Sequence, residues 1–482
     1  MDTGVVFFIL SRLAAAAGLA LAFPFLLALY RGDPAGGFAF TAAVSLLAGG
    51  LLRAKSHFPK YVITPKEGTA IVALGWIMTS FLYAIPYAAS GILSPLDALV
   101  ESISGLTGTG ATVITDLEII PKSYLFFRAM THWLGGLGII VIFVALIPQK
   151  SRGTASMVNA ESTGPTTSRA LPRIKEMSKA LFLVYLVFTL SCSASYVLLG
   201  MDPFDAVCHA FATIATGGFS TWNNSTAHYS SPALQLTIVF FMTVASANFG
   251  VYVAAWQKGI RVFLKDTEFR VYLCVVGAAA LLMGAHLAWQ GVLPLPSALQ
   301  QALFHASSVS STTGFVSYDF ETWPSFDKMI ILMLMMMGGC AGSTTGGIKV
   351  TRIILLFKST RALLLQRLHP HAYIHVRSNG SNYPSDILVS VYGFFLVYIT
   401  AGFFWAALLM ADGLAMVDAV GVSFSTMSNV GPAFGLFGAT DTYAPLPFMS
   451  KIIVCCSMLF GRLECFTLMA IFIPNFWKKG GW

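Results

Sequence analysis

The chain has 482 residues, of which 56% are hydrophobic and 10% charged, and its formal net charge is +8. Soluble domains average about 45–50% apolar and about 25% charged residues, so this composition excludes an ordinary soluble protein and predicts a polytopic membrane protein. The seven cysteines lie in apolar segments without C-x-x-C spacing. That distribution argues against a disulfide framework and against a cysteine metal site.

Two apolar runs open the chain, near Val5–Tyr30 and Phe38–Leu52. About 20 apolar residues cross a hydrocarbon core of roughly 30 Å, so both runs are predicted to be transmembrane helices. A cleaved signal peptide is the alternative for the first run, which is nevertheless long for such a segment, lacks a basic leader and contains Arg12. A retained helix pair within residues 1–57 is favoured.

After this pair, one order repeats four times: a full span, a segment too short to cross, and a second full span. The eight full spans, which bring the predicted total to ten, lie near Thr69–Ser90, Ser123–Ile147, Ala180–Leu199, Leu234–Trp256, Val271–Trp289, Met329–Leu356, Ile387–Met410 and Phe448–Pro474. The predicted fold is all-α, with four pseudo-symmetric helix–pore-helix–helix repeats around a central ion pore. The predicted repeats are residues 58–152, 153–262, 263–370 and 371–482.

Most lysines and arginines lie in connections that the predicted spans place on one side of the membrane. These connections are residues 53–66, 150–179, 258–270, 349–377 and 478–479. The positive-inside rule makes that side cytoplasmic, so the four short segments enter from the opposite face. Because the positive charge is divided among loops rather than gathered in one patch, we expect no nucleic-acid partner.

The four short segments share one pattern that leads to a glycine. Each begins with Asp or Gln followed by Ala and reaches the glycine thirteen residues later, at Gly110, Gly218, Gly314 and Gly431. Ser94-Pro95 and Asp202-Pro203 place a capping side chain before a proline, which is typical of a helix start. The segments are therefore predicted to be half-helices whose C-termini point into the membrane. Since a helix C-terminus carries about half a negative charge, four of them would stabilise a cation.

The chain beside each glycine is predicted to form an ion-selectivity filter. Non-helical backbone at membrane depth is tolerated only where it is buried in protein or lines a water-filled path, and glycine takes backbone angles closed to other residues. The carbonyls expected to replace the water of a dehydrated ion belong to Gly108, Thr109, Thr216, Gly217, Thr312, Thr313, Asn429 and Val430. For any single glycine, close helix packing is the alternative, but four copies at one offset favour the filter.

One equivalent position within the short segments differs between the copies. It holds Glu101, His209, His305 and Val422. The histidines are expected to pack or to hydrogen-bond rather than to bind a metal. Glu101 is a candidate for attracting cations at the mouth, although Val422 indicates that no charge is required there.

The predicted span that begins at Met329 is interrupted by GGCAGSTTGG, with five glycines in ten residues. Each interior glycine costs about 1 kcal/mol relative to alanine in a helix, so the helix is predicted to break and to place a flexible segment inside the filter. A passive kink is the alternative. The candidate gate residues of this segment are Gly338, Gly339, Gly342, Ser343, Thr344, Thr345, Gly346 and Gly347.

Arg462 lies inside the last predicted span. An unpaired cation in the membrane costs several kcal/mol unless it meets a cavity or a partner. Facing the pore, Arg462 would oppose cation passage and hydrogen-bond the glycine-rich segment in a closed state. A pair with Glu464, or a side chain that extends to the membrane edge, is the alternative.

Four strings in chain order carry a resemblance to a known family. They are RAMTHWLGGLGIIVIFVALIP (128–148), FATIATGGFST (211–221), GGCAGSTTGGIKV (338–350) and MLFGRLECFTL (458–468). The chain resembles the Trk/Ktr/HKT superfamily of potassium transporters, most closely its bacterial TrkH branch. The resemblance implies a K+-conducting subunit of the inner membrane, a homodimer, and control by a cytosolic ring of nucleotide-binding TrkA-type subunits. It also implies that residues 338–347 are a gating loop and that Arg462 faces the pore.

Two classes of function remain open for this sequence. The favoured one is a channel-like subunit for K+ uptake; the alternative is a K+ symporter coupled to H+ or Na+. Transporters of the second class typically have inverted repeats and ionisable residues near the midplane, whereas these repeats run in parallel. A Kdp-type channel subunit would share the fourfold architecture but predicts a pump partner.

The chain has no nucleotide-binding glycine loop, nucleophile triad or zinc spacing, so we expect neither enzymatic activity nor an organic cofactor. The regulatory partner is expected to act through the basic connections, including Lys349 and Arg352.

Overall fold

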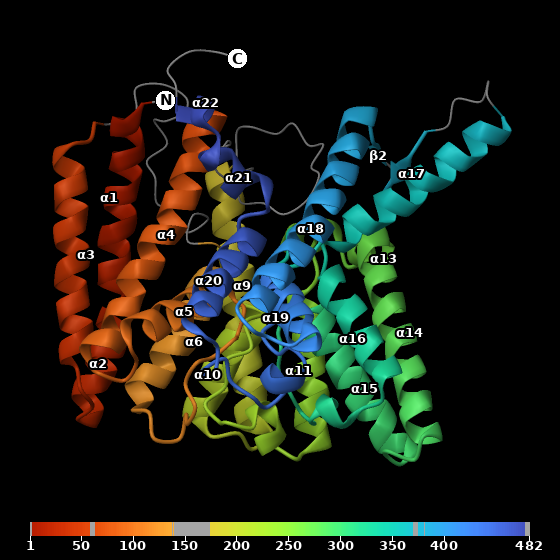
Figure 1. The fold of residues 1–482 in the computed structure, drawn as a ribbon, viewed down its shortest axis with the longest axis horizontal. Coiled ribbons are helices and arrows are strands. Elements are labelled where there is room, and N and C mark those ends of the chain that lie inside the picture. Colours follow the sequence, from red (N-terminus) through yellow and green to blue (C-terminus); the bar gives the residue numbers. More distant parts are fainter. Residues whose placement is uncertain are drawn as a thin grey trace.

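The computed structural model describes residues 2–57, 63–136, 138, 174–369, 375–379 and 381–477. Figure 1 shows a bundle built almost entirely of helices, with one small hairpin of β1 (Arg377–Ser378) and β2 (Ser381–Asn382). Within the described residues, six helices are long and apolar enough to cross a membrane, and one bent pair would make a seventh. The prediction of a helical membrane protein is confirmed at this level.

The first three helices stand together at one edge of the molecule, drawn in red to orange in Figure 1: α1 (Thr3–Ala20), α2 (Ala22–Arg31) and α3 (Gly36–Ala54). The backbones of α1 and α3 approach closely, because a Cβ atom on Gly49 would lie only 2.9 Å from the carbonyl oxygen of Ser11. Small residues permit such close packing inside a membrane. The predicted run Val5–Tyr30 forms two consecutive helices, α1 and α2, because the first ends at Ala20 and the second begins at Ala22.

Each of the four following units begins with a long helix. These are α4 (Pro65–Ala89), α9 (Ile174–Leu198), α14 (Thr267–Trp289) and α18 (Ser385–Ala411). Even α14, with 23 residues, is about 35 Å long at 1.5 Å per residue, enough to cross the hydrocarbon core. The start of α4 is fixed by a capping box, in which Thr64 Oγ1 accepts the Glu67 N–H (3.3 Å) and a Glu67 carboxylate oxygen accepts the Thr64 N–H (2.9 Å).

A short helix follows in each unit. These are α5 (Pro95–Thr107), α10 (Pro203–Ile214), α15 (Leu295–Ser310) and α19 (Met416–Ser428). With 13 residues, α5 is about 20 Å long and cannot cross. Ser94 accepts the Asp97 N–H at 3.3 Å and Asp202 accepts the Phe204 N–H at 3.0 Å, so the predicted helix starts have capping contacts.

Within the described residues, the last helix of the second, third and fourth units is interrupted. The helices are α6 (Lys122–Gly136), α11 (Pro232–Ala245) with α12 (Phe249–Lys258), α16 (Ser325–Met337) with α17 (Val350–Leu368), and α20 (Phe448–Arg462) with α21 (Phe466–Phe472). The smaller elements are α13 (Arg261–Lys265), α22 (Pro474–Trp477), η1 (Ser225–His228), η2 (Phe320–Thr322) and η3 (Gly435–Phe437).

Besides Val5–Tyr30, two of the predicted continuous spans are wrong as single helices. Leu234–Trp256 bends by 87° between α11 and α12. The Asn248 side chain accepts the Gly250 N–H at 2.8 Å and starts α12, while the Ser246 carbonyl accepts the Cys340 N–H at 2.9 Å. Polar partners thus replace the helical bonds lost at the bend. Phe448–Pro474 breaks after Arg462. These two breaks, the interruption of Met329–Leu356 and the part of Ser123–Ile147 that lies outside the described residues explain why fewer than ten long spans are found in the described part of the chain.

Buried apolar side chains join consecutive units around a closed circle. Trp133 of the first unit stacks on Phe211 of the second, with ring centroids 5.3 Å apart. The second and third units share an apolar cluster, as do the third and fourth and the fourth and first. The packing therefore places all four units around one centre.

The predicted repeat boundaries fall in connections or outside the described residues. The boundary at 262/263 lies inside α13, in the connection between the second and third units. Those at 57/58, 152/153 and 370/371 lie at the edge of, or outside, the described residues. The part of the predicted span Ser123–Ile147 after residue 138 also lies outside them.

Candidate functional site

The loop that follows each short helix has the same unusual backbone path. The glycine thirteen residues after the start of each short segment has positive φ in all four loops, at Gly110 (78°), Gly218 (82°), Gly314 (76°) and Gly431 (101°). The residue two positions earlier also has positive φ, at Gly108 (70°), Thr216 (53°), Thr312 (52°) and Asn429 (57°). A non-glycine residue in this left-handed region costs roughly 1–2 kcal/mol. Three such costs at one equivalent position indicate a conformation that the surrounding structure imposes.

The structure brings the four loops together in a closed ring. A side chain on each glycine would collide with the carbonyl oxygen that precedes the glycine of the next loop. The collisions pair Gly110 with Gly217, Gly218 with Thr313, Gly314 with Val430, and Gly431 with Thr109. Since the last pair returns to the first loop, the eight residues predicted to supply carbonyls lie around one centre.

The side chains of these loops bond one another and are buried. Thr109 Oγ1 lies 2.7 Å from Thr107 Oγ1 and accepts a hydrogen bond from Asn429 Nδ2 at 2.8 Å. Thr313 Oγ1 lies 2.7 Å from Ser311 Oγ. The hydroxyl groups of Thr109 and Thr313 are therefore held by neighbouring side chains.

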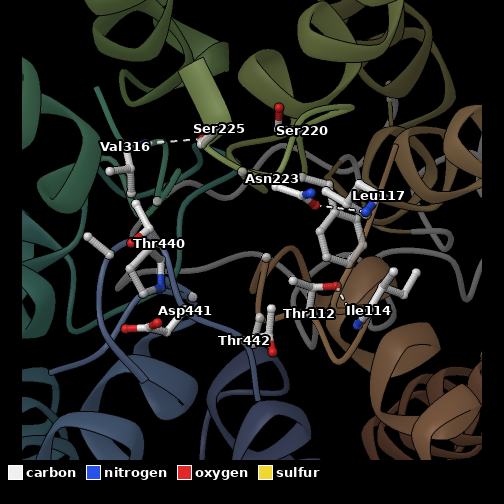
Figure 2. Close-up of a pocket in the computed structure, with 18 of the residues that line it drawn as sticks. Thr112, Ile114, Leu117, Ser220, Asn223, Ser225, Val316, Thr440, Asp441 and Thr442 are labelled. Atoms are coloured by element: carbon white, nitrogen blue, oxygen red, sulfur yellow. Dashed lines mark hydrogen bonds between the residues drawn. The ribbon is translucent and has the colours of Figure 1, made fainter. Parts of the chain in front are cut away.

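A pocket of about 90 Å³ lies on one side of the ring and is lined by all four glycines (Figure 2). This volume is enough for several water molecules. Thr440, Asp441 and Thr442 line it from the loop before α20, and Figure 2 shows them across the pocket from Ser220 and Asn223. One side of the ring therefore borders a polar pocket that can hold water.

The glycine-rich segment 338–349 separates α16 from α17 and lies against the other side of the ring. Thr344 Oγ1 donates to the Ile214 carbonyl and accepts from Thr216 Oγ1, both at 3.2 Å. The Gly346 N–H donates to Thr312 Oγ1 at 2.8 Å, and a Cβ on Gly346 would collide with the Ser428 carbonyl oxygen. The segment thus touches the ends of three of the four short helices.

Within that segment, Gly338, Gly342 and Gly347 have φ values of 69°, 73° and 72°. Gly339 packs against Thr345, whose Oγ1 accepts the Gly339 N–H at 3.1 Å. Ser343 Oγ lies 2.8 Å from Thr345 Oγ1. These internal contacts make the segment a folded loop with its own structure.

Arg462, at the end of α20, lies against the glycine-rich segment. Its Nη1 donates to the Thr344 carbonyl at 2.9 Å, and its Nη2 donates to the carbonyls of Gly135 and Gly136 at the end of α6. Glu464, the alternative partner, forms an ion pair with Arg352 at 2.8 Å. Arg462 therefore links the segment to the last helix of the first unit.

Sequence reasoning missed a carboxylate that holds the same segment. The side chain of Glu268, in the first turn of α14, is buried and accepts the N–H groups of Ala341 (2.7 Å) and Thr351 (2.9 Å). Charge-assisted bonds of this kind are about twice as strong as neutral ones. In the sequence, the only signal is that Glu268 is an acidic residue at the edge of an apolar span. It does not stand out there, because the neighbouring connection is also charged.

Two expectations about charged residues need correction. Glu101 is fully buried and paired with Arg128 at 2.7 Å, so it does not stand free at the mouth. Lys349 is 1% exposed and donates to Thr345 Oγ1 at 2.9 Å, and Arg352 is 9% exposed. A partner cannot reach these two cations directly, because the segment and Glu464 surround them.

The fold defines a multi-pass helical membrane protein, in which the loops after four short helices meet around one centre. The family model TrkH, described as a cation transport protein, matches residues 37–479. The chain belongs to the TrkH family. This confirms the resemblance seen in the sequence, and because the family consists of transport proteins, it also confirms the prediction that the chain is not an enzyme.

Individual relatives match over nearly their whole length. The potassium uptake protein TrkH of Escherichia coli strain K12 is 36% identical over 465 residues, 95% of each chain. TrkH of Halomonas elongata is 34% identical over 446 residues, 92% of each chain. The crystal structure of the potassium transporter TrkH from Vibrio parahaemolyticus has a TM-score of 0.90 at 34% identity, covering 99% of this chain and 100% of that one.

Proposed function

We propose that this chain is the channel-like, pore-forming subunit of a Trk-type potassium uptake system in the bacterial inner membrane. The observation that carries the proposal is the closed ring of glycine and carbonyl contacts among the four loops. Relatives of similar length are named as potassium uptake proteins. Four equivalent loops around one centre form the geometry that a single ion path requires.

Backbone carbonyls supply the K+ ligands in this proposal. Thr109, Gly217, Thr313 and Val430 each lie between two residues of positive φ and themselves have negative φ. Because residues with positive and negative φ alternate along the loop, successive carbonyls turn to one side of the chain. There they replace the water around a dehydrated ion. The negative ends of the four short helices add a field that favours a cation.

The glycine-rich segment and Arg462 form the gate. The segment lies directly against the ring, and Arg462 joins it to α6 across the path. Opening requires the segment to leave Thr216 and Thr312. The charge of Arg462 also opposes a cation in the closed state.

The proposed assembly is a homodimer with a cytosolic ring of TrkA-type subunits. Since Lys349 and Arg352 are buried, contact with the ring would fall on Lys358, Arg361 and Arg367, which are exposed along α17. This helix begins where the gate segment ends, so a force on α17 reaches the gate directly. Nucleotide binding in the ring would then shift the populations of closed and open states.

Glu268 tests this gate without touching the ring. Glu268→Gln should raise basal Rb+ flux in liposomes, because the N–H groups of Ala341 in the segment and Thr351 in the first turn of α17 lose a charged acceptor. A loss of about 1.5 kcal/mol from the closed state shifts the closed–open balance roughly tenfold. Glu321→Gln is the matched control, since Glu321 pairs with Lys328 at 2.7 Å in the same unit, away from the segment. Equal basal flux in the two variants would remove Glu268 from the gate.

Flux into liposomes that contain the purified chain tests the function itself. Uptake of K+, Rb+, Na+ and Li+ should be compared with and without a proton gradient. A channel-like subunit predicts uptake of K+ and Rb+ that follows their own gradients. Dependence of K+ uptake on a proton or sodium gradient would instead establish the symporter, and absence of any K+ or Rb+ flux would contradict the proposal.

A further inference from the structure

One buried ion pair, Glu101–Arg128, belongs to neither the proposed filter carbonyls nor the proposed gate. Glu101 of α5 and Arg128 of α6 are 0% and 1% exposed, and Arg128 Nε lies 2.7 Å from a carboxylate oxygen of Glu101. Burying two charges is costly unless both are fully hydrogen-bonded. The other hydrogen bonds of the pair therefore identify the parts of the chain that it holds in place.

Glu101 hydrogen-bonds the extended chain that follows Gly110 in the first loop. Its second carboxylate oxygen accepts the Val113 N–H at 2.9 Å, and Thr112 Oγ1 donates to the carboxylate at 3.1 Å. Val113 and Thr112 follow Gly110 by three and two residues. The carboxylate thus fixes the outer edge of the first filter loop against its own short helix.

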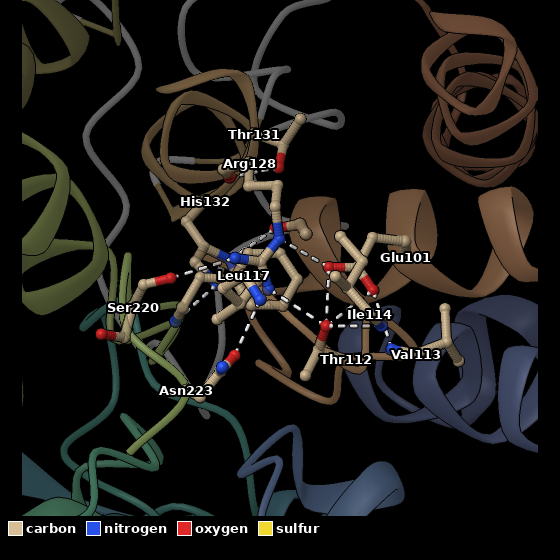
Figure 3. Close-up of polar contacts among 12 residues, drawn as sticks. Glu101, Thr112, Val113, Ile114, Leu117, Arg128, Thr131, His132, Ser220 and Asn223 are labelled. Carbon is tan, nitrogen blue, oxygen red and sulfur yellow. Dashed lines mark hydrogen bonds and ion pairs between the residues drawn. The ribbon is translucent and has the colours of Figure 1, made fainter. Parts of the chain in front are cut away.

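Arg128 carries this support to the second unit. Its Nη1 donates to the Ser220 carbonyl at 3.0 Å, its Nη2 donates to Thr112 Oγ1 at 3.1 Å, and the guanidinium lies 4.0 Å from the ring centroid of Phe219. Figure 3 shows Arg128 between Glu101 and Thr112 on one side and Ser220 on the other. Thr112 and Ser220 each stand two residues after a ring glycine, so one guanidinium joins equivalent points of two loops.

The other loops have weaker supports at these positions. In the second unit, His209 stands where Glu101 does and contacts Ser220 Oγ at 3.0 Å. In the third unit, the equivalent positions hold His305 and Val316, and His305 Nδ1 contacts the carbonyl oxygen of Gln301 on its own helix at 2.9 Å. In the fourth, Val422 and Ala433 are apolar and buried. At the positions equivalent to Glu101 and Thr112, and within the described residues, a charged pair is therefore found only between the first and second loops.

We propose that Glu101 and Arg128 are a positioning pair that fixes the outer edge of the ring between the first two loops and thereby sets the preference for K+ over Na+. The inference rests on the proposed filter. Neither side chain is an ion ligand, because both are buried and occupied by protein. Loosening this edge lets the carbonyls of two loops close around a smaller ion, which reduces selectivity. Arg128 also lines the entrance pocket, so removing its counter-charge would also repel incoming cations.

Three variants test the pair: Arg128→Lys, Glu101→Gln and Glu101→Asp. Lysine keeps the charge but has no planar fork to reach three acceptors on two units. Purified variants should be compared in liposomes for the ratio of Rb+ to Na+ uptake and for half-saturation by Rb+. We expect Arg128→Lys to lower the ratio at least tenfold, and Glu101→Gln to lower it and also to raise the half-saturating concentration.

Lys451→Gln is the matched control, because it breaks the Lys451–Asp97 pair (2.6 Å) at the first turn of the same short helix without touching the loops. It should keep the ratio within twofold of the parent. A ratio within twofold of the parent in every variant that inserts would overturn the inference. Failure of all three variants to insert, while Lys451→Gln inserts, would overturn it as well, since the pair would then be a folding requirement.

Measuring Gly218→Ala in the same experiment distinguishes a failure of the positioning role from a failure of the proposed filter. If Gly218→Ala lowers the ratio and Arg128→Lys does not, the filter stands and the positioning role fails. If Gly218→Ala leaves the ratio unchanged, the proposed filter fails and the inference fails with it.

Discussion

Gly218→Ala should abolish selective Rb+ uptake while the protein still inserts in the membrane. A methyl group at residue 218 would collide with the Thr313 carbonyl oxygen of the next loop, and alanine is strained at a φ of 82°. The collision displaces a carbonyl that the account assigns to the ion. Uptake of Rb+ and Na+ by equal reconstituted amounts of protein measures the loss.

The control for this substitution is Gly277→Ala in the long helix α14. A Cβ atom at Gly277 meets nothing within 4 Å, and its φ is helical, so alanine should be tolerated or slightly stabilising. Valine at Gly110, Gly314 or Gly431 should reproduce the loss, because each glycine faces the equivalent carbonyl. Unchanged Rb+ preference in all four ring variants would show that the glycines serve helix packing instead.

Arg462→Ala should raise basal cation leak in the absence of any cytosolic partner. The substitution removes hydrogen bonds from a charged donor to the Thr344 carbonyl and to the end of α6. Bonds of this kind contribute about 1.5–3 kcal/mol each, so an increase of tenfold or more is expected. Shortening the segment 338–347 should act in the same direction, since it withdraws the loop from the ring. Both changes are measured as K+ and Na+ leak from liposomes.

Arg462→Lys separates the two ways in which the arginine would close the path. If its charge is the barrier, lysine keeps the leak low; if the guanidinium is a link between the loop and α6, lysine leaks because it cannot reach both sets of carbonyls. The contacts at both ends favour the second outcome. Basal leak no higher than the parent's for both Arg462→Ala and the shortened loop would leave the segment as a packing break.

The sequence was informative wherever function depends on residue type at a fixed offset. Four glycines at one spacing marked the loops, and a cation inside an apolar span marked Arg462. Arg128 lies inside a predicted span as well, and the same reasoning, applied consistently, would have selected it. Its partner was not predictable, because the Glu101 contact depends on how α5 folds back beside α6.

Other features depend on tertiary structure that no local pattern encodes. Thr216, Thr312 and Asn429 take left-handed backbone angles, although threonine disfavours them, because the ring imposes the path. The bend between α11 and α12 follows Ser246, where no proline or glycine marks a break, and the carbonyl freed there is occupied by Cys340 of the gate segment. The bend and the broken helix α16–α17 thus support each other, but only the break after α16 is marked in the sequence, by the glycines of residues 338–347.

The central claim is that backbone carbonyls of the four loops bind the transported ion. The most direct test is anomalous diffraction from crystals of the protein in which Tl+ replaces K+. We expect a Tl+ peak at the centre of the ring, surrounded by the carbonyls of Gly108 and Thr109, Thr216 and Gly217, Thr312 and Thr313, and Asn429 and Val430. An empty ring at saturating Tl+, or ordered Tl+ held by side chains elsewhere, would contradict it.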